Sequence, residues 1–295
     1  MSKMPISSRL VFSLPTRRGR VMRNNLFLIG AINLCLSGSA YALSPAEFTS
    51  LEYHVNTGVG KTLPYAAKSQ TSSFKQAFNF IEFDDELSQK LVTYIDTPDR
   101  AFKAESIQIR VREHITKPRK SKITVKLRAK APEGFGELSN YRKAEIDYTE
   151  GKAAYSVSYD IPFSPGDIDV KKLDMELVFN LLKKNKVVWD MLGPIYESNK
   201  KQFIQTVVMR TNEWEGTLKD ERFSNLEIDF QLWTPYYRKP RVTFTEFSFK
   251  GHVSDKAKLE EAYQFLYQKV QEVGLSSGHQ GSKTKATFKM TEGFK

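Results

Sequence analysis

Cysteine is nearly absent from this sequence of 295 residues, where Cys35 is the only one. It lies in an apolar N-terminal run that we expect to be removed, so the mature chain would have no disulfide and no thiolate metal ligand. Histidine is also scarce: His54, His114, His252 and His279 show no metal-binding spacing. The strings typical of P-loops, of serine-hydrolase nucleophile elbows and of HExxH metalloproteases are missing as well.

Long hydrophobic runs are missing except near the start of the chain. The stretch "MRNNLFLIGAINLCLSGSAYALSP" has a basic flank at Arg23, an apolar run from Leu26, and the small-x-small triplet Ala40-Tyr41-Ala42. This order of features predicts an export signal cleaved after residue 42, and therefore a periplasmic or secreted protein. The run is too short and too polar to span a bilayer well, so we expect no transmembrane span after cleavage. A retained membrane anchor is the alternative.

The charge balance is basic. Lys and Arg number 45 against 34 Asp and Glu, a formal net charge of +11. This surplus favours polyanionic partners such as phosphates, nucleic acid or an acidic membrane surface, without choosing among them.

Periodicity predicts one β-rich domain over residues 43–274, after an N-terminal extension and signal peptide over 1–42 and before a disordered tail over 275–295. Period-two alternation is the mark of a strand with one buried face. It recurs in 106–113, 122–130, 142–148, 154–161, 203–211, 225–233 and 241–251. Helical spacing of apolar residues predicts helices over 167–192 and 254–275, and a short one is expected over 83–92.

Charged residues in these strands come in doublets of one sign on one face, opposite an apolar face. The doublets are Arg110 and Arg112, Lys126 and Arg128, Glu145 and Asp147, and Glu227 and Asp229. Solvated outer faces of an antiparallel sandwich are one explanation. The other is a barrel whose interior carries the doublets, where basic side chains bind phosphate oxygens and carboxylates bind a divalent cation.

The order of these motifs resembles that of the CYTH domains, or triphosphate tunnel metalloenzymes, and is closest to an exported bacterial branch. The similarity lies in "TYIDTPDRAFKAESIQIRVRE", "ITVKLRAK", "AEIDY", "VVMRT", "LEIDFQLW" and "EFSFK", and it runs from about residue 91 to 274. It implies an α+β fold: an antiparallel eight-stranded β-tunnel, or closed barrel, flanked by helices. It also implies binding of triphosphate, polyphosphate or another phosphorylated polyanion, often with magnesium or manganese.

Site residues follow from the resemblance by position. Those implied to bind phosphate are Arg110, Arg112, Lys126, Arg128, Arg210 and Lys250. Those implied to bind metal, or to orient the basic residues, are Glu145, Asp147, Glu227, Asp229 and Glu246. No specific nucleic-acid partner is expected.

The chain departs from the family at its first strand, where members carry Glu-x-Glu-x-Lys. The nearest equivalent is Glu52 with His54 two positions on. This difference leaves three readings open. The chain is a metal-dependent phosphohydrolase, a non-catalytic anion-binding pseudoenzyme, or a plain periplasmic β-barrel carrier whose charges lie on its surface.

Overall fold

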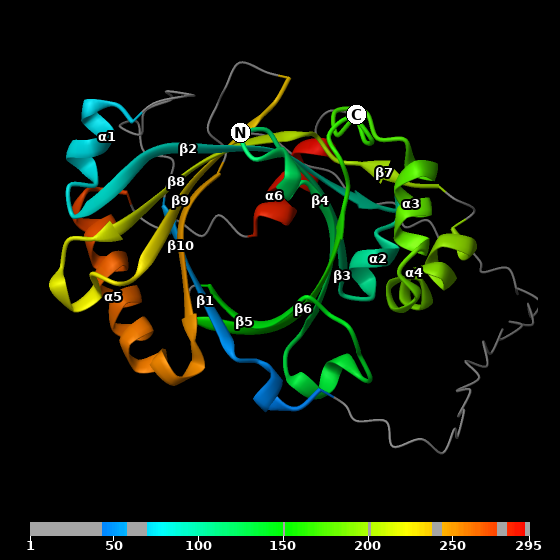
Figure 1. Ribbon diagram of the computed structural model, residues 1–295, viewed down its shortest axis with the longest axis horizontal. Coiled ribbons are helices and arrows are strands. Elements are labelled where there is room, and N and C mark those ends of the chain that lie inside the picture. The colour runs from blue at the N-terminus through cyan, green and yellow to red at the C-terminus, as the bar shows by residue number, and fades with distance from the viewer. Residues whose placement is uncertain are drawn as a thin grey trace, which may run out of the picture. The chain divides into compact units, whose positions relative to one another are not determined.

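The computed structural model describes residues 43–57, 70–149, 151–199, 202–237, 244–275 and 282–292 (Figure 1). The predicted signal segment over 1–42 lies outside these ranges. No helix in the described part of the chain is long and apolar enough to cross a membrane.

A ten-stranded sheet forms the centre of the fold and closes on itself (Figure 1). Its strand order is β3-β4-β6-β5-β1-β10-β9-β8-β2-β7, and an additional β3–β2 pairing joins the ends of the ring and leaves β7 outside it. The strands are β1 (Ser50–Thr57), β2 (Ile81–Asp96), β3 (Ile107–His114), β4 (Lys122–Ala129), β5 (Lys143–Thr149), β6 (Lys152–Pro162), β7 (Ile204–Gln205), β8 (Met209–Leu218), β9 (Glu227–Pro235) and β10 (Phe244–His252).

The closed sheet confirms the predicted tunnel flanked by helices. All strands except β7 take part in the ring, so the ring has one strand more than the eight expected. One neighbouring pair, β1 and β5, is parallel, whereas the other ladders are antiparallel. Closure removes the exposed sheet edges that would otherwise pair with other chains.

Helices cover the outside of the ring (Figure 1). On one side α2 (Ala101–Ala104), α3 (Met175–Lys183) and α4 (Lys186–Ser198) pack on the apolar faces of β3, β4 and β6. On the other side α1 (Ser72–Ala77) and α5 (Lys256–Glu272) pack on the apolar faces of β1, β9 and β10. A further helix, α6 (Lys283–Glu292), follows near the C-terminus. Because the apolar faces point to these helices, the charged faces point into the ring.

Three local predictions are corrected by the structure. Residues 83–92 belong to β2 instead of a helix, because this segment pairs with both β3 and β8 and helical propensity yields to tertiary pairing. Residues 167–192 contain two helices rather than one, with Asn185 capping α4 by accepting from the Val188 amide. The tail predicted to be disordered contains α6, whose Phe288 is buried.

Candidate functional site

The inner face can be followed round the ring through the strand register. On β3, Arg110 lies opposite Thr124 of β4, two residues before Lys126 on the same face. On β9, Asp229 lies opposite Ser248 of β10. The inner residues from β1, β5, β8 and β2 include Glu52, His54, Glu145, Asp147, Glu213, Glu215 and Lys90. The charged doublets therefore face one shared interior instead of bulk solvent on an outer sheet face.

Arg110 and Arg112 are neighbouring cations of this interior, and neither has a carboxylate partner among the described residues. Among the described residues neither guanidinium makes an ion pair, and the buried Nε of Arg110 has no hydrogen-bond partner. Burial lowers the pKa of Arg112 to about 10, and the positive charge of Arg110 adds to the shift. Two like charges held together away from water favour the binding of an anion between them.

Lys126 and Arg128 are placed differently, because they are already neutralised. The Lys126 ammonium lies 2.9 Å from Glu145 Oε1 and 3.0 Å from Asp147 Oδ2, and Arg128 also pairs with Asp147. Burial raises the pKa of Asp147, but the charges of Lys126 and Arg128 outweigh it and hold the pKa below the usual value. This side of the wall is a salt-bridge network, so Glu145 and Asp147 hold cations of the chain itself.

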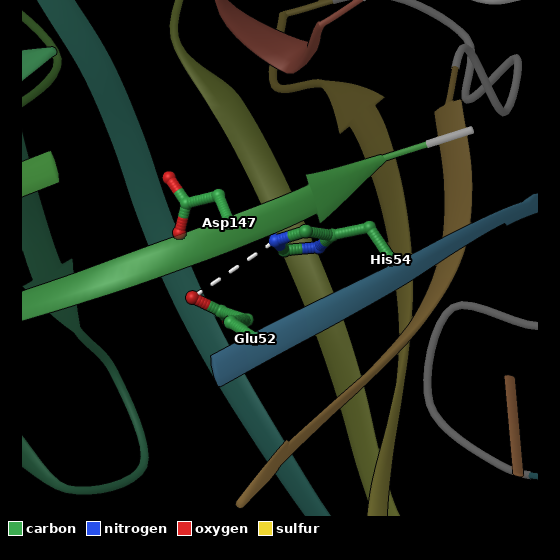
Figure 2. A group of neighbouring side chains, drawn as sticks. All are labelled: Glu52, His54 and Asp147. Carbon is green, nitrogen blue, oxygen red and sulfur yellow. Dashed lines mark ion pairs between the residues drawn. The ribbon is translucent and has the colours of Figure 1, made fainter. Parts of the chain in front are cut away.

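A first group of possible metal ligands joins β1 and β5. Glu52, His54 and Asp147 each offer one atom within 4.8 Å of the others, and Figure 2 shows the three side chains pointing toward one another. His54 Nε2 lies 3.9 Å from Glu52 and its Nδ1 lies 3.5 Å from Glu246, while Lys250 lies 3.1 Å from Glu52. Burial lowers the pKa of His54, but Glu246 and Glu52 raise it above its usual value overall. A protonated His54 donates no lone pair to a metal, so this group is suited to internal ion pairing.

A second group joins β8 and β9. Glu213, Glu215 and Asp229 also each offer an oxygen within 4.8 Å of the others. Burial raises the pKa of Asp229 to about 7, and the Glu213 carboxylate adds to this shift. Lys90 pairs with Glu213, whereas Glu215 and Asp229 make no ion pair in the described ranges. Three crowded carboxylates with one cation among them match the hard oxygen donors that Mg²⁺ and Mn²⁺ prefer.

One cavity brings Arg112 together with Glu213 and Glu215 of the second acidic group. It has a volume of about 420 Å³, and its walls include Arg112, Lys90, Lys122, Glu213 and Glu215. Its rim carries further basic residues from the β3–β4 connection, namely Lys117, Arg119 and Lys120. The cavity therefore has a basic entrance and an interior that holds both anion-binding and cation-binding groups.

Not every residue implied by the resemblance reaches this interior. Arg210 pairs with Leu91 and Thr234, which places it on the outer face of β8, where its guanidinium lies 5.0 Å from the ring centroid of Tyr236. Glu227 is on the inner side but exposed at the strand end. Lys250 and Glu246 lie on the inner face of β10 but are already paired: Lys250, 48% exposed, pairs with Glu52, and the buried Glu246 pairs with His54 and with Lys283 of α6.

Several inner residues were missed from the sequence. Glu213 and Glu215 alternate with Trp214 in "TNEWEG", but the strand predicted there ended at residue 211. Extending the alternation by four residues would have found both glutamates. Lys90 was hidden by the helix expected over 83–92.

Several solved structures have a chain path similar to that of this protein. No protein-family profile and no curated protein matches the sequence. An adenylyl cyclase-type protein of Hippeastrum, described as having a dominant triphosphatase activity, is 12% identical with a TM-score of 0.47, covering 83% of this chain and 97% of its own. An adenylate cyclase-type protein of Bacillus halodurans is 12% identical (82% and 100% covered, TM-score 0.42). A Pyrococcus horikoshii protein is 11% identical (82% and 99% covered, TM-score 0.39). At these levels the function rests on the site geometry.

Proposed function

We propose that the tunnel binds a linear phosphorylated polyanion, such as triphosphate or polyphosphate, and hydrolyses it with a divalent cation. The observation that carries this proposal is the Arg110–Arg112 pair, two inner guanidiniums without a carboxylate partner in the described part of the chain. Guanidinium groups bind phosphate oxygens through charge-assisted, often bidentate hydrogen bonds. An incoming phosphate would supply the missing anion and relieve the repulsion between them.

The group of carboxylates that joins β8 and β9 supports the proposal that the protein hydrolyses its ligand. Glu213, Glu215 and Asp229 would hold Mg²⁺ or Mn²⁺, and the ion would supply positive charge to phosphate oxygens and lower the pKa of a bound water molecule. Lys90, already paired with Glu213, lies on the wall of the same cavity as Arg112. These side chains would orient the phosphate groups while water adds to phosphorus and the bridging P–O bond breaks, releasing orthophosphate.

A second candidate function is binding without turnover. It is favoured by the group of possible metal ligands that joins β1 and β5. In that group Glu52 is paired with Lys250, and Asp147 is paired with Lys126 and Arg128. Because these carboxylates are neutralised by lysine and arginine side chains, no metal ion is needed to balance their charge. Binding would then depend on Arg110, Arg112 and the other basic residues of the cavity, and it would be insensitive to Mn²⁺.

Two measurements separate these functions. Calorimetric titration with tripolyphosphate at low salt tests binding, and phosphate release from the same compound with and without Mn²⁺ tests turnover. Binding with Mn²⁺-dependent release supports the hydrolase, and binding without release supports the non-catalytic protein. Absence of binding would reject both.

We further propose that the protein is exported to the periplasm or secreted. The support is the basic flank, apolar run and Ala40-Tyr41-Ala42 triplet of the N-terminal segment. Mass spectrometry of the protein recovered from fractionated cells tests this. A mature N-terminus near residue 43 in the periplasmic or extracellular fraction is expected, and an uncut chain in the cytoplasm would contradict it.

A further inference from the structure

Lys90 belongs to both the acidic and the basic part of the proposed site. Its ammonium pairs with Glu213, and the two side chains are only 13% and 9% exposed. The same lysine lines the cavity together with Arg112. Lys90 therefore lies beside a carboxylate that could bind a metal ion and beside the space that a phosphate could enter.

The ammonium of Lys90 lies where it would oppose a metal ion. Glu213, Glu215 and Asp229 offer oxygens within 4.8 Å of one another, and of these Glu213 pairs with Lys90. An ion held by Glu213 would be a direct neighbour of the ammonium. Like charges repel strongly in a buried site, because little water screens them. Metal binding should therefore push Lys90 away from Glu213.

An acceptor for the displaced ammonium is already present on β8. Thr211 is the cross-strand neighbour of Lys90, and directly opposed residues of antiparallel strands hold their side chains about 5 Å apart. Thr211 is 2% exposed, and its Oγ1 has no hydrogen-bond partner among the described residues. Because a buried polar atom without a partner is costly, this oxygen would gain from a hydrogen bond that Lys90 donates.

The cavity offers the displaced ammonium a second partner only when an anion enters. Lys90 lies opposite His114 and Val92 lies opposite Arg112, so Lys90 and Arg112 are diagonal neighbours across β2 and β3. Long side chains at diagonal positions are within reach of one another. Once it is released from Glu213, Lys90 adds a second positive charge beside Arg112. A phosphate group could then accept hydrogen bonds from both side chains.

We propose that Lys90 exchanges partners when a divalent cation binds: it leaves Glu213 to the ion, donates to Thr211 Oγ1 and binds a phosphate oxygen of the ligand. This inference rests on the proposed function and adds a coupling to it. The cation makes Lys90 available to the phosphate, and by linkage the phosphate must tighten binding of the cation by the same factor.

The test is a binding cycle measured by calorimetry on the full chain. The probe is imidotriphosphate, a triphosphate analogue whose P–N–P bridges resist hydrolysis, titrated with and without Mn²⁺. Complex formation between Mn²⁺ and the analogue in solution is measured separately and included in the fit. The ratio of the two affinities for the analogue is the coupling factor, and it should exceed one in the wild type.

Lys90→Met removes the ammonium and keeps an unbranched side chain. Mn²⁺ alone should bind about tenfold more tightly, because Glu213 no longer holds a competing cation, and the coupling factor should fall by about the same amount. Lys122→Met is the matched control, since Lys122 lines the same cavity but pairs with Asp160 at 2.7 Å. It should weaken binding of the analogue equally with and without Mn²⁺ and leave the coupling factor unchanged.

Thr211→Val tests the hydroxyl by an effect of opposite sign. The metal-free protein should melt at the same temperature or higher, because an unpartnered hydroxyl is removed, whereas Mn²⁺ should bind about fivefold more weakly. Thr93→Val is its control, because Thr93 Oγ1 donates to the Thr206 carbonyl oxygen at 3.0 Å. That variant should melt at a lower temperature and bind Mn²⁺ like the wild type.

The outcomes separate this inference from the proposed function. Coupled binding in the wild type that Lys90→Met leaves unchanged, or that Lys122→Met reduces equally, would overturn the partner exchange and spare the proposed function. Wild-type affinity for Mn²⁺ in Thr211→Val would overturn the part assigned to the hydroxyl. A wild-type protein that binds neither Mn²⁺ nor the analogue would reject the proposed function and this inference with it.

Discussion

Arg110 and Arg112 point to the same side of β3, and in the described part of the chain neither guanidinium meets a carboxylate. The other basic doublet named above is neutralised, because Lys126 and Arg128 share Asp147. The unpaired doublet is therefore where an external anion has most to gain, and the predictions begin there.

Arg110→Ala should weaken tripolyphosphate binding about ten- to a hundredfold, because a charge-assisted hydrogen bond contributes about 1.5–3 kcal/mol. The free protein should melt at the same temperature or higher, since repulsion with Arg112 is relieved. Arg210→Ala is the matched control, because Arg210 lies on the outer face beside Tyr236. Calorimetry and thermal melting measure both effects. Equal affinity in the two variants would contradict anion binding at Arg110.

Asp229 makes stability depend on pH in a defined direction. Its pKa is raised to about 7 by burial and by Glu213, so between its unfolded value near 4 and pH 7 the folded state holds a proton that the unfolded state has lost. This contribution to stability is therefore present at low pH and lost as pH rises to about 7. Asp229→Asn should melt higher than the wild type above pH 7 and converge with it near pH 4. A constant difference at all pH values would contradict the shift.

Divalent cations should offset the loss of stability that ionisation of Asp229 causes. Mn²⁺ bound by Glu213, Glu215 and Asp229 needs the ionised carboxylates, so the melting temperature gained with Mn²⁺ should grow as pH rises through 7. Glu213→Gln should reduce the gain, whereas Glu227→Gln, at an exposed strand end, should leave it intact. If Mn²⁺ still raised the melting temperature of Glu213→Gln but no longer raised that of Glu227→Gln, the assignment of the metal to Glu213, Glu215 and Asp229 would be wrong.

Asp147→Ala should destabilise the fold by about 3 kcal/mol, because it breaks a buried ion pair and leaves Arg128 without its carboxylate partner. Lys126 keeps Glu145 at 2.9 Å, which limits the loss. Asp190→Ala removes an exposed pair with Lys186 on α4 and should cost less than about 0.5 kcal/mol. Chemical denaturation compares the two variants. Similar small losses would show that the Asp147 network contributes little.

Residue alternation by itself determined which side chains share a face, because successive residues of a strand point to opposite sides whatever the strand pairs with. Arg110 with Arg112, and Glu145 with Asp147, could therefore be grouped from the sequence. The resemblance added closure of the sheet, and the structure confirms it. Local pattern was misleading where pairing overrides propensity, as in residues 83–92, which β3 and β8 hold in strand β2.

Only the tertiary structure decided which groups meet across strands. Lys126 reaches Asp147 through the neighbouring strands β4, β6 and β5, and Asp229 joins Glu213 and Glu215 because β9 pairs with β8. The resemblance implied, by matching position, that Arg210 faces the interior and binds phosphate. At its α6 end, however, the tunnel is apolar inside, so Met209 turns inward and Arg210 outward. The reason is that the alternation of side chains along a strand is set locally. Which of its two faces points into the tunnel depends on packing between residues that are far apart in the chain.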